Sequence, residues 1–240
     1  MRKAVIVTGA SNGIGRATVE RLAADGYLAI NLDIAAAPTA GAHIVNHRVD
    51  LADEAATREL LSDIVAEHEV AGLVNNAGHA YTATLEETST ELLEKTWAVN
   101  LRAATLCAQM VVPGMKARRF GRIVNIASSA ALGRRLRTAY AGSKGALISM
   151  TKVWALELGS HGITVNAIGP GPVATELWRR MNPADSEEVQ RRIANVPVGR
   201  VGEPADIANA IAFFMDPRAG YVTGQALYVC GGMSIGSAAI

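Results

Sequence analysis

The sequence predicts an α/β fold, a doubly wound parallel sheet covered by helices, in a single domain spanning residues 1–240. Three observations lead to this prediction. Short apolar runs alternate with helical patterns, which is typical of successive βαβ units. Most of the runs are almost continuously apolar, as in strands that are buried on both faces of a parallel sheet. No proline-, glycine- or serine-rich linker divides the chain.

The expected elements follow one another in order. The strands are expected at 4–7, 28–32, 43–49, 71–74, 122–126, 163–167 and 226–229. The helices are expected at 13–24, 53–68, 89–117, 139–159 and 204–215. Pro113 interrupts the third of these, so that helix is expected to kink or to end early, because proline removes a backbone donor. The polar residues 171–198 are expected to form a helical insertion that covers a site.

Composition excludes several classes of function. The net charge is only +1, which argues against a nucleic-acid partner. No apolar run reaches membrane-spanning length, and the run after Lys3 is too short for a signal peptide. Two cysteines and five scattered histidines offer neither a disulfide framework nor a metal site. We therefore expect a cytoplasmic protein with a small-molecule substrate and with no membrane, nucleic-acid or metal partner.

A glycine-rich turn, TGASNGIG at 8–15, joins the first strand to the first helix. Gly9 can adopt backbone angles closed to other residues, and Gly13 and Gly15 lack a Cβ, so a phosphate or a facing strand can approach closely. The helix N-terminus then offers free N–H groups and a positive dipole to a pyrophosphate. Between a strand and a helix, this turn predicts a dinucleotide site that includes Ser11, Asn12 and Ile14.

Asp33 ends the second strand, eighteen residues after Gly15. A carboxylate at this place can accept both hydroxyls of an adenosine ribose and would repel a 2′-phosphate. No basic residue at position 12 or 34 offsets that repulsion. The cofactor is therefore expected to be NAD, with NADP the less favoured choice. The alternative for Asp33 alone is an ordinary strand-end aspartate.

Two further strands are expected to end at the same edge of the sheet as the glycine-rich turn, where open α/β sheets bind ligands in a crevice. Asp50, followed by Leu51, comes after the third strand, where its carboxylate could hold the adenine amino group or cap the helix that starts near residue 53. Both readings stay open at this point. The small-residue turn NNAG at 75–78, with Asn76, Ala77 and Gly78, follows the fourth strand and would let the backbone approach the cofactor.

Tyr140 and Lys144 lie one helical turn apart, and Ser128 ends the fifth strand. Lowering the pKa of a tyrosine from about 10 to about 7 requires roughly 4 kcal/mol of differential stabilisation of the phenolate. A lysine four residues on lies on the same helix face and can supply part of it. Such spacings also occur by chance on solvated helices. A serine in the same crevice makes chance the weaker explanation.

Seven motifs in order resemble the short-chain dehydrogenase/reductase family, over nearly the whole chain and in the manner of its 3-oxoacyl-carrier-protein reductases. They are TGASNGIG at 8–15, NNAG at 75–78, Asn100 in WAVN, Ser128 in IAS, YAGSK at 140–144, PGPVAT at 170–175 and YVTGQ at 221–225. The resemblance implies an NAD(P)-dependent oxidoreductase with a Rossmann fold. It also implies a homotetramer, with a homodimer as the second choice.

The resemblance also implies roles for single residues. Tyr140 would be the general acid/base, Lys144 would lower the pKa of Tyr140 and bind the nicotinamide ribose, Ser128 would polarise the substrate oxygen, and Asn100 would hold a relay water. Thr175 and the backbone at Pro170, Gly171 and Val173 would hold the carboxamide. Tyr140, Lys144 and the residues that would hold the carboxamide are therefore also part of the predicted cofactor site.

Two departures from the family pattern are visible. Tyr140 follows Ser128 by twelve residues, one fewer than the family spacing, so Ser129 is a rival, although a one-residue loop deletion is the simpler explanation. The segment between Asp33 and His43 is short and alanine-rich, so the helix expected there is reduced to a loop.

Arginines at 134, 135 and 137 lie in a loop expected to border the substrate, and Arg179 and Arg180 lie in the insertion. They could bind a carboxylate, phosphate or sulfonate, or they could be solvated or contact a second subunit. We therefore expect NAD-dependent interconversion of a secondary alcohol and a ketone on a small polar, anionic substrate. The alternatives are an NADPH-dependent 3-oxoacyl-ACP/CoA reductase and a non-catalytic dinucleotide sensor. His79 and Tyr81 are further candidates for substrate contact.

Overall fold

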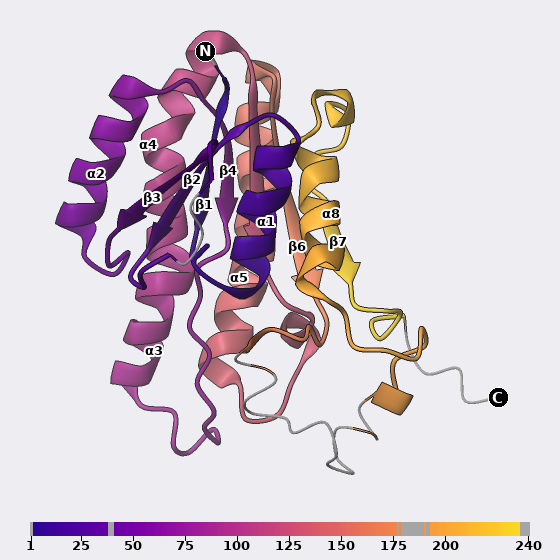
Figure 1. Ribbon diagram of the computed structural model, residues 1–240. Helices are drawn as coiled ribbons and strands as arrows, with labels where there is room; N and C mark the ends of the chain where they lie inside the picture. Colours follow the sequence, from indigo (N-terminus) through magenta and orange to yellow (C-terminus); the bar gives the residue numbers. More distant parts are fainter. Residues whose placement is uncertain (1, 38–40, 177, 179–189, 191–192, 236–240) are drawn as a thin grey trace.

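The computed structural model describes residues 2–37, 41–176, 178, 190 and 193–235. Its centre is a parallel seven-stranded sheet in the order β3-β2-β1-β4-β5-β6-β7, and the carboxyl ends of the strands point toward one edge (Figure 1). The seven expected strands are present as β1 Ala4–Thr8, β2 Leu28–Asp33, β3 Ile44–Arg48, β4 Val70–Asn75, β5 Gly121–Ile126, β6 Ile163–Pro170 and β7 Ala226–Val229.

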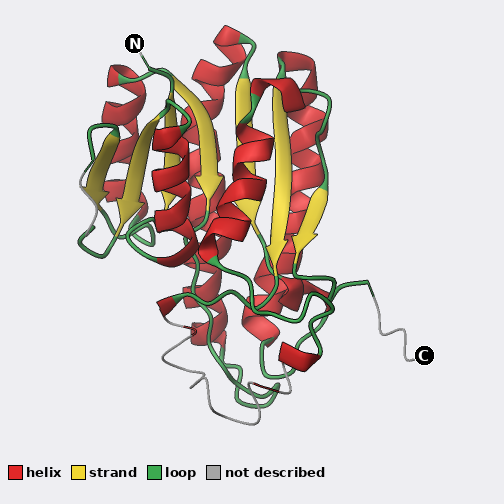
Figure 2. Ribbon diagram, turned by 45° about the vertical axis from the view of Figure 1, so that its right-hand side comes forward, coloured by secondary structure: helices red, strands yellow, loops and turns green. Residues whose placement is uncertain are grey.

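Helices cover both faces of this sheet (Figure 2). Helices α1 (Gly13–Ala24) and α8 (Pro204–Met215) pack on one face, and α2 (Glu54–Glu67), α4 (Ala103–Arg118) and α5 (Thr138–Leu158) pack on the other. Helix α3 (Thr90–Trp97) lies beyond the carboxyl edge of the strands (Figure 1). Short turns complete the described structure: η1 (Ala98–Arg102, a π-helix), η2 (Ser129–Leu132), η3 (Gly159–His161) and η4 (Pro217–Ala219). The doubly wound α/β fold is confirmed.

The continuous apolar runs are explained by two cores, one on each face. In β1, Ala4 and Ile6 join the core beneath α2, α4 and α5, whereas Val5 and Val7 join the core beneath α1 and α8. All four side chains are fully buried. Because successive residues of a strand face opposite sides, burial on both faces requires apolar residues at every position.

The expectation that Pro113 ends its helix early is wrong. Helix α4 continues past Pro113 to Arg118, and the break in the predicted helix 89–117 falls at η1 instead. Val111 and Met115, on either side of the proline, are buried in the core. Tertiary packing of this apolar face outweighs the roughly 3 kcal/mol that proline costs inside a helix.

Two other expectations concern loops. Residues 34–37 and 41–43 contain no helix, as expected for the shortened segment after Asp33. Half of the expected insertion at 171–198, including Arg179 and Arg180, lies outside the described residues. In the part of the chain that is described, no helix has both the length and the apolar character needed to cross a bilayer.

Candidate functional site

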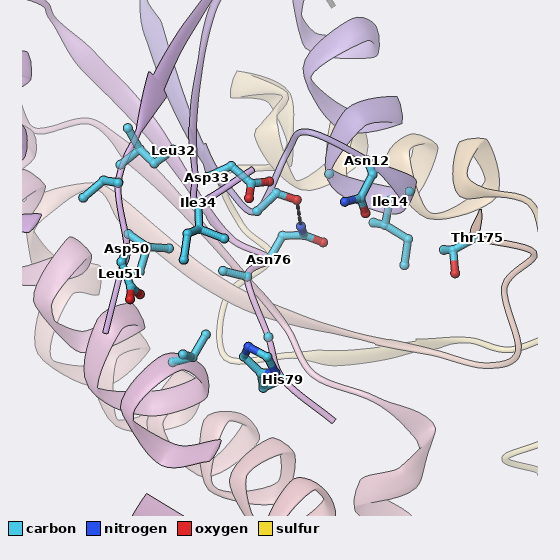
Figure 3. A pocket seen from close by; sticks show the side chains of 17 residues that line it. Asn12, Ile14, Leu32, Asp33, Ile34, Asp50, Leu51, Asn76, His79 and Thr175 are labelled. Atoms are coloured by element: carbon cyan, nitrogen blue, oxygen red, sulfur yellow. Dashed lines mark hydrogen bonds between the residues drawn. The ribbon is translucent and has the colours of Figure 1, made fainter. Parts of the chain in front are cut away.

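A cleft of about 330 Å³ opens at the carboxyl ends of β1, β2 and β4. The strand order reverses direction between β1 and β4, which is where open α/β sheets bind ligands. Figure 3 shows Asp33, Asp50 and Leu51 on one side of the cleft and Thr175 on the other. Twelve residues of the predicted cofactor site line it: Gly9, Asn12, Gly13, Ile14, Gly15, Asp33, Asp50, Leu51, Asn76, Ala77, Gly78 and Thr175.

The glycines of the first turn form a close-packed cradle, in which side chains would press against neighbouring parts of the chain. Gly9 has a φ of 67°, a conformation that favours glycine, and a methyl group on it would lie 2.8 Å from the Cα of Ala77. A methyl group on Gly15 would lie 2.6 Å from Asn76 Nδ2, and one on Gly13 would lie 3.1 Å from Thr175 Cγ2. The turn therefore fits a pyrophosphate at the N-terminus of α1.

Asn76 fastens this turn to the end of β4. Its side-chain amide donates to the carbonyl oxygens of Thr8 and Gly9, at 2.9 Å each. In return, the Thr8 hydroxyl accepts from the backbone N–H groups of Asn76 and Ala77, at 3.0 Å each. The two strand ends that border the cleft are thus held together by side chains as well as by the sheet.

The side chain of Asp33, at the end of β2, is hydrogen-bonded to the glycine-rich turn. Its carboxylate is buried, and it accepts hydrogen bonds from the backbone N–H groups of Ser11 at 2.8 Å and Ala35 at 3.0 Å. A free strand-end aspartate would not be oriented in this way. Ser11 serves this arrangement and does not line the cleft itself.

Asn31 supports the turn from beneath, and the sequence analysis did not single it out. Its Oδ1 accepts from the backbone N–H of Ala10 at 2.9 Å, and its Nδ2 donates to Ser11 Oγ at 3.2 Å and to Asn46 Oδ1 at 3.1 Å. The side chain is 1% exposed. A polar residue inside an otherwise apolar strand was the available signal, because such a residue must find partners when buried.

A basic residue lies beside Asp33 in the sheet, although none stands at position 12 or 34 of the sequence. Arg48 on β3 is paired in register with Asp33 on β2, and its Nε donates to the carbonyl oxygen of Ile34 at 3.0 Å. The sheet brings the two together although fifteen positions separate them in the chain. Positions 12 and 34 were therefore not the only ones that bear on a 2′-phosphate.

The alternative that Asp50 caps the second helix is wrong. Asp53 is the N-cap of α2 and accepts from the backbone N–H of Ala56 at 3.1 Å. Asp50 instead accepts from the N–H of Ala52 at 2.9 Å and lines the cleft with Leu51. Its role toward the adenine stays a prediction.

Tyr140, Lys144 and Ser128 come together beside the cleft. The Ser128 side chain lies close enough to the phenol to lower the pKa of Tyr140, which favours Ser128 over Ser129 as the serine that faces Tyr140. Burial nevertheless raises the pKa of Tyr140 above its ordinary value near 10, against the lowering effects of Ser128, Arg137 and Arg134. In this chain alone, the phenol therefore stays protonated at neutral pH.

Lys144 is buried, and its Nζ lies 5.8 Å from the centroid of the Tyr140 ring. The ammonium donates to the carbonyl oxygen of Ile126 at 2.7 Å. Desolvation lowers its pKa to about 8, so the side chain is still mostly charged at pH 7. A methyl group on Gly78 would lie 3.2 Å from Nζ, which places the lysine at the Gly78 end of the cleft.

Asn100 lies in η1, where its side chain is 1% exposed. Oδ1 accepts from the backbone N–H of His79 at 2.7 Å, and Nδ2 donates to His79 O at 3.1 Å and to Ser143 Oγ at 2.9 Å. The carboxamide thus holds the loop after β4. Ser143 lies within the YAGSK motif but was not among the site residues predicted from the sequence.

Some of the residues predicted for the cofactor site lie away from the cleft, and some residues that line it were not predicted. Pro170, Gly171 and Val173 do not line it: Gly171 packs against Cys230, and Val173 pairs with Gly202. Five lining residues were not assigned to the cofactor from the sequence: Leu32, Ile34, Val49, His79 and Val99. For Leu32, Ile34 and Val49 the signal was apolar character at strand ends, which is hard to separate from core packing, whereas His79 had been expected to contact the substrate. Within the described ranges, no three His, Cys, Asp or Glu side chains are grouped to hold a metal ion.

The loop that carries the three arginines packs against the loop after β4. Arg137 donates from a terminal guanidinium nitrogen to the carbonyl oxygen of Tyr81 at 3.0 Å, and Ala83 N–H donates to Leu136 O at 3.2 Å. The rings of His79 and Tyr81 stack, with centroids 5.5 Å apart and planes 7° from parallel. These loops border the side of the site where Tyr140 lies.

Comparisons with known proteins agree with this geometry. A family model described as enoyl-(acyl carrier protein) reductase matches residues 9–234. The (2S)-[(R)-hydroxy(phenyl)methyl]succinyl-CoA dehydrogenase subunit BbsD of Thauera aromatica is 35% identical over 243 residues, covering 97% of this chain and 97% of that protein. The 3-oxoacyl-[acyl-carrier-protein] reductase of Staphylococcus epidermidis is 34% identical over 251 residues, covering 97% and 99% respectively.

Solved structures agree as well. A protein of Beutenbergia cavernae assigned as an NAD(P)-dependent gluconate 5-dehydrogenase, with NADP bound at low occupancy, matches with a TM-score of 0.91 and 33% identity. The match covers 98% of this chain and 97% of that one. The chain therefore belongs to the short-chain dehydrogenase/reductase family and is an NAD(P)-dependent oxidoreductase.

Proposed function

We propose that the protein interconverts a secondary alcohol and a ketone on a small polar, anionic substrate, with NAD as cofactor and Tyr140 as general acid/base. The observation that carries the proposal is the cluster of Ser128, Tyr140 and Lys144 at the Gly78 end of the cleft. A proton donor, a second hydroxyl and a buried cation lie together there, as carbonyl reduction needs.

The chain's own residues hold the cofactor and handle the proton. Asp33 binds the adenosine ribose, Asp50 the adenine, and the N-terminus of α1 the pyrophosphate. When bound, the nicotinamide supplies or accepts the hydride. In reduction, Tyr140 gives its proton to the carbonyl oxygen while Ser128 donates a hydrogen bond to the same oxygen. Lys144 stabilises the phenolate that remains.

The raised pKa of Tyr140 keeps the phenol protonated at neutral pH, so the proton that reduction requires is in place before the reaction. In oxidation the phenolate must form first. The charge on Lys144 and a hydrogen bond from Ser128 then have to lower the pKa by several units, and this makes oxidation faster at alkaline pH. Asn100 and Thr175 complete the proposed set, with Pro170, Gly171 and Val173 supplying backbone toward the carboxamide.

The preference for NAD rests on Asp33, whose oriented carboxylate repels a 2′-phosphate. Arg48 acts in the opposite sense, and the Beutenbergia cavernae relative holds NADP. Titrating the purified protein with NADH and NADPH side by side, followed by nicotinamide fluorescence, decides the question. A lower Kd for NADH supports the proposal, and a lower Kd for NADPH overturns it.

An anionic substrate is supported by the arginine loop. The positive charges of Arg134 and Arg137 reach the Tyr140 phenol and lower its pKa. Two relatives are named for carboxylate-bearing compounds, a succinyl-CoA derivative and gluconate. Arg134→Ala and Arg137→Ala should raise the KM for a hydroxy acid and leave the KM for a neutral diol unchanged. Equal KM values for the hydroxy acid in both variants and the wild type would discard the anionic substrate.

The second candidate is an NADPH-dependent 3-oxoacyl-ACP/CoA reductase. It is favoured by the Staphylococcus epidermidis relative, and the same arginines could bind a phosphopantetheine phosphate. Acetoacetyl-CoA with NADPH is the test substrate for it. The third candidate, a non-catalytic sensor, is opposed by the intact Ser128, Tyr140 and Lys144 cluster. Turnover of any ketone removes it.

A homotetramer is proposed for the assembly, with a homodimer as the alternative. Val153 and Leu156 on α5 are 48% and 86% exposed, and Leu227 on β7 is 43% exposed, so apolar surface on two elements is left for partners. Light scattering after size exclusion measures the mass directly. The cytoplasmic location and a substrate-covering insertion at 171–198 stay predictions from the sequence.

A further inference from the structure

A buried serine on α5 joins three segments that meet at the reactive end of the cleft. Ser143 is fully buried, and its hydroxyl donates to the carbonyl oxygen of Tyr140 at 2.7 Å. The same hydroxyl accepts from Asn100 Nδ2 at 2.9 Å. Only the nitrogen of a carboxamide can donate, so this contact, together with the bond from Nδ2 to His79 O at 3.1 Å, orients the Asn100 side chain.

The other end of the Asn100 side chain holds the wall of the cleft. Oδ1 accepts from the backbone N–H of His79 at 2.7 Å, while Nδ2 donates to His79 O as well as to Ser143. His79 lines the cleft, as Figure 3 shows. A continuous path of hydrogen bonds therefore runs from the catalytic helix through Asn100 to the cofactor cleft.

The hydrogen-bonded path passes through Asn100, where the backbone forms a π-helical turn and the side chain packs tightly against Gly78. Asn100 lies in the π-helical turn η1, a feature that is frequent at functional sites. A methyl group on Gly78 would lie 3.2 Å from Lys144 Nζ and 3.4 Å from Asn100 Oδ1. A displaced Asn100 carboxamide would therefore disturb Gly78 and the lysine ammonium together.

Serine hydroxyls inside helices commonly bond to a carbonyl one turn back, with no consequence beyond the helix. Thr151 on α5 provides the comparison. It donates to Leu147 O at 2.8 Å, accepts from Asn125 Nδ2 at 2.9 Å and is 1% exposed. Its pattern of bonds is the same as that of Ser143, but its asparagine partner does not contact His79.

We propose that Ser143 is a positioning residue: through Asn100, it holds the loop at Gly78 and His79 in a fixed geometry against Tyr140 and Lys144. Its effect on turnover rests on the proposed proton transfer at Tyr140. Its effect on the loop does not, because that effect follows from hydrogen bonds within the chain. Two separate measurements therefore test the two parts.

The first measurement is amide hydrogen exchange at His79, followed by NMR on the protein without added cofactor. Ser143→Ala removes the acceptor for Asn100, and Thr151→Val is the matched control. We expect exchange at His79 to accelerate about tenfold in Ser143→Ala and to stay within about twofold of wild type in Thr151→Val. Equal acceleration in both variants, or none in Ser143→Ala, overturns the proposal.

The second measurement is steady-state kinetics with the ketone that the wild type turns over best. We expect Ser143→Ala to lower kcat about tenfold and to displace its pH profile, while KM and the Kd for NADH stay within about twofold. Ser143→Cys keeps the size of the side chain but is a weak hydrogen-bond partner, so an intermediate kcat is expected. It also replaces Ser143→Ala in both measurements if the alanine variant does not fold.

The two failures can be told apart. If wild type reduces no ketone and oxidises no alcohol, the proposed function fails, while exchange at His79 still decides the role of Ser143. If wild type is active and Ser143→Ala matches Thr151→Val in kcat, pH profile and exchange, Ser143 has no positioning role. A general loss of structure would lower the melting temperature of both variants and would raise exchange in all segments.

Discussion

Replacing Gly15 by alanine tests the cradle at the glycine-rich turn. A methyl group there would lie 2.6 Å from Asn76 Nδ2 and 2.7 Å from Ala10 Cα, closer than real side chains come. Relief requires the turn to move, which strains or breaks the bond from Asn76 to Gly9 O. Overpacking costs about 1–3 kcal/mol, and a lost hydrogen bond adds about 1 kcal/mol.

The expected destabilisation of Gly15→Ala is therefore roughly 2–4 kcal/mol, which lowers the melting temperature by about 4–16 °C for a chain of this size. The same movement displaces the N–H groups proposed to bind the pyrophosphate, so the Kd for NADH should rise at least about tenfold. Differential scanning fluorimetry and NADH fluorescence titration measure the two effects.

Gly142→Ala is the matched control. Gly142 lies in α5 with ordinary helical φ, and a methyl group on it would meet nothing within 4 Å. Alanine is the better helix former, so this variant should be stabilised by about 0.5–1 kcal/mol. If Gly15→Ala binds NADH as wild type does and melts no lower than Gly142→Ala, the reasoning about the cradle is refuted.

Three further predictions concern the chemistry. Tyr140→Phe should lower kcat by about 10²–10⁴-fold while the Kd for NADH is unchanged; near-normal turnover would remove Tyr140 as the acid/base. Arg48→Ala should weaken NADPH binding more than NADH binding, because the guanidinium lies beside the Asp33 site; an equal change in both Kd values would show that Arg48 does not sense the 2′-phosphate. Burial lowers the pKa of Lys144 to about 8, so between about pH 8 and 10 the unfolded chain binds a proton that the folded chain lacks, and stability rises with pH across that window. Lys144→Met removes this penalty, so it should raise the urea midpoint at pH 7 while turnover falls; a lower midpoint would contradict the burial argument.

The fold was largely predictable, because periodicity and strand burial are local signals. The seven strands begin and end within three residues of their expected bounds, and only the interruption of helix 89–117 was misplaced. Pro113 is a strong local signal against a helix. The buried face of α4 overrides it, and no local pattern reports how well that face is packed.

The candidate site was predictable where its residues share one element or one turn. The turn at 8–15 and the pair Tyr140 and Lys144 are of this kind. Asp50 shows the limit of such reasoning: its sequence position allowed a helix cap as well as a ligand contact, and only the geometry of Asp53 separated the two. The expectation that Lys144 controls the pKa of Tyr140 stays a prediction, since burial is the largest effect on that pKa and the opposing effects come from Ser128, Arg137 and Arg134.

The sequence by itself therefore determined the fold class and identified the glycine-rich turn and the pair Tyr140 and Lys144 as candidates, since strand-turn-helix patterns and helical spacing are visible among neighbouring residues. The tertiary structure alone decided that Arg48 stands beside Asp33, that Asn31 supports the turn, and that Ser143 reaches His79 through Asn100. The physical reason is distance along the chain. Hydrogen bonds between these residues depend on strand order and helix placement, which no pattern of neighbouring residues specifies.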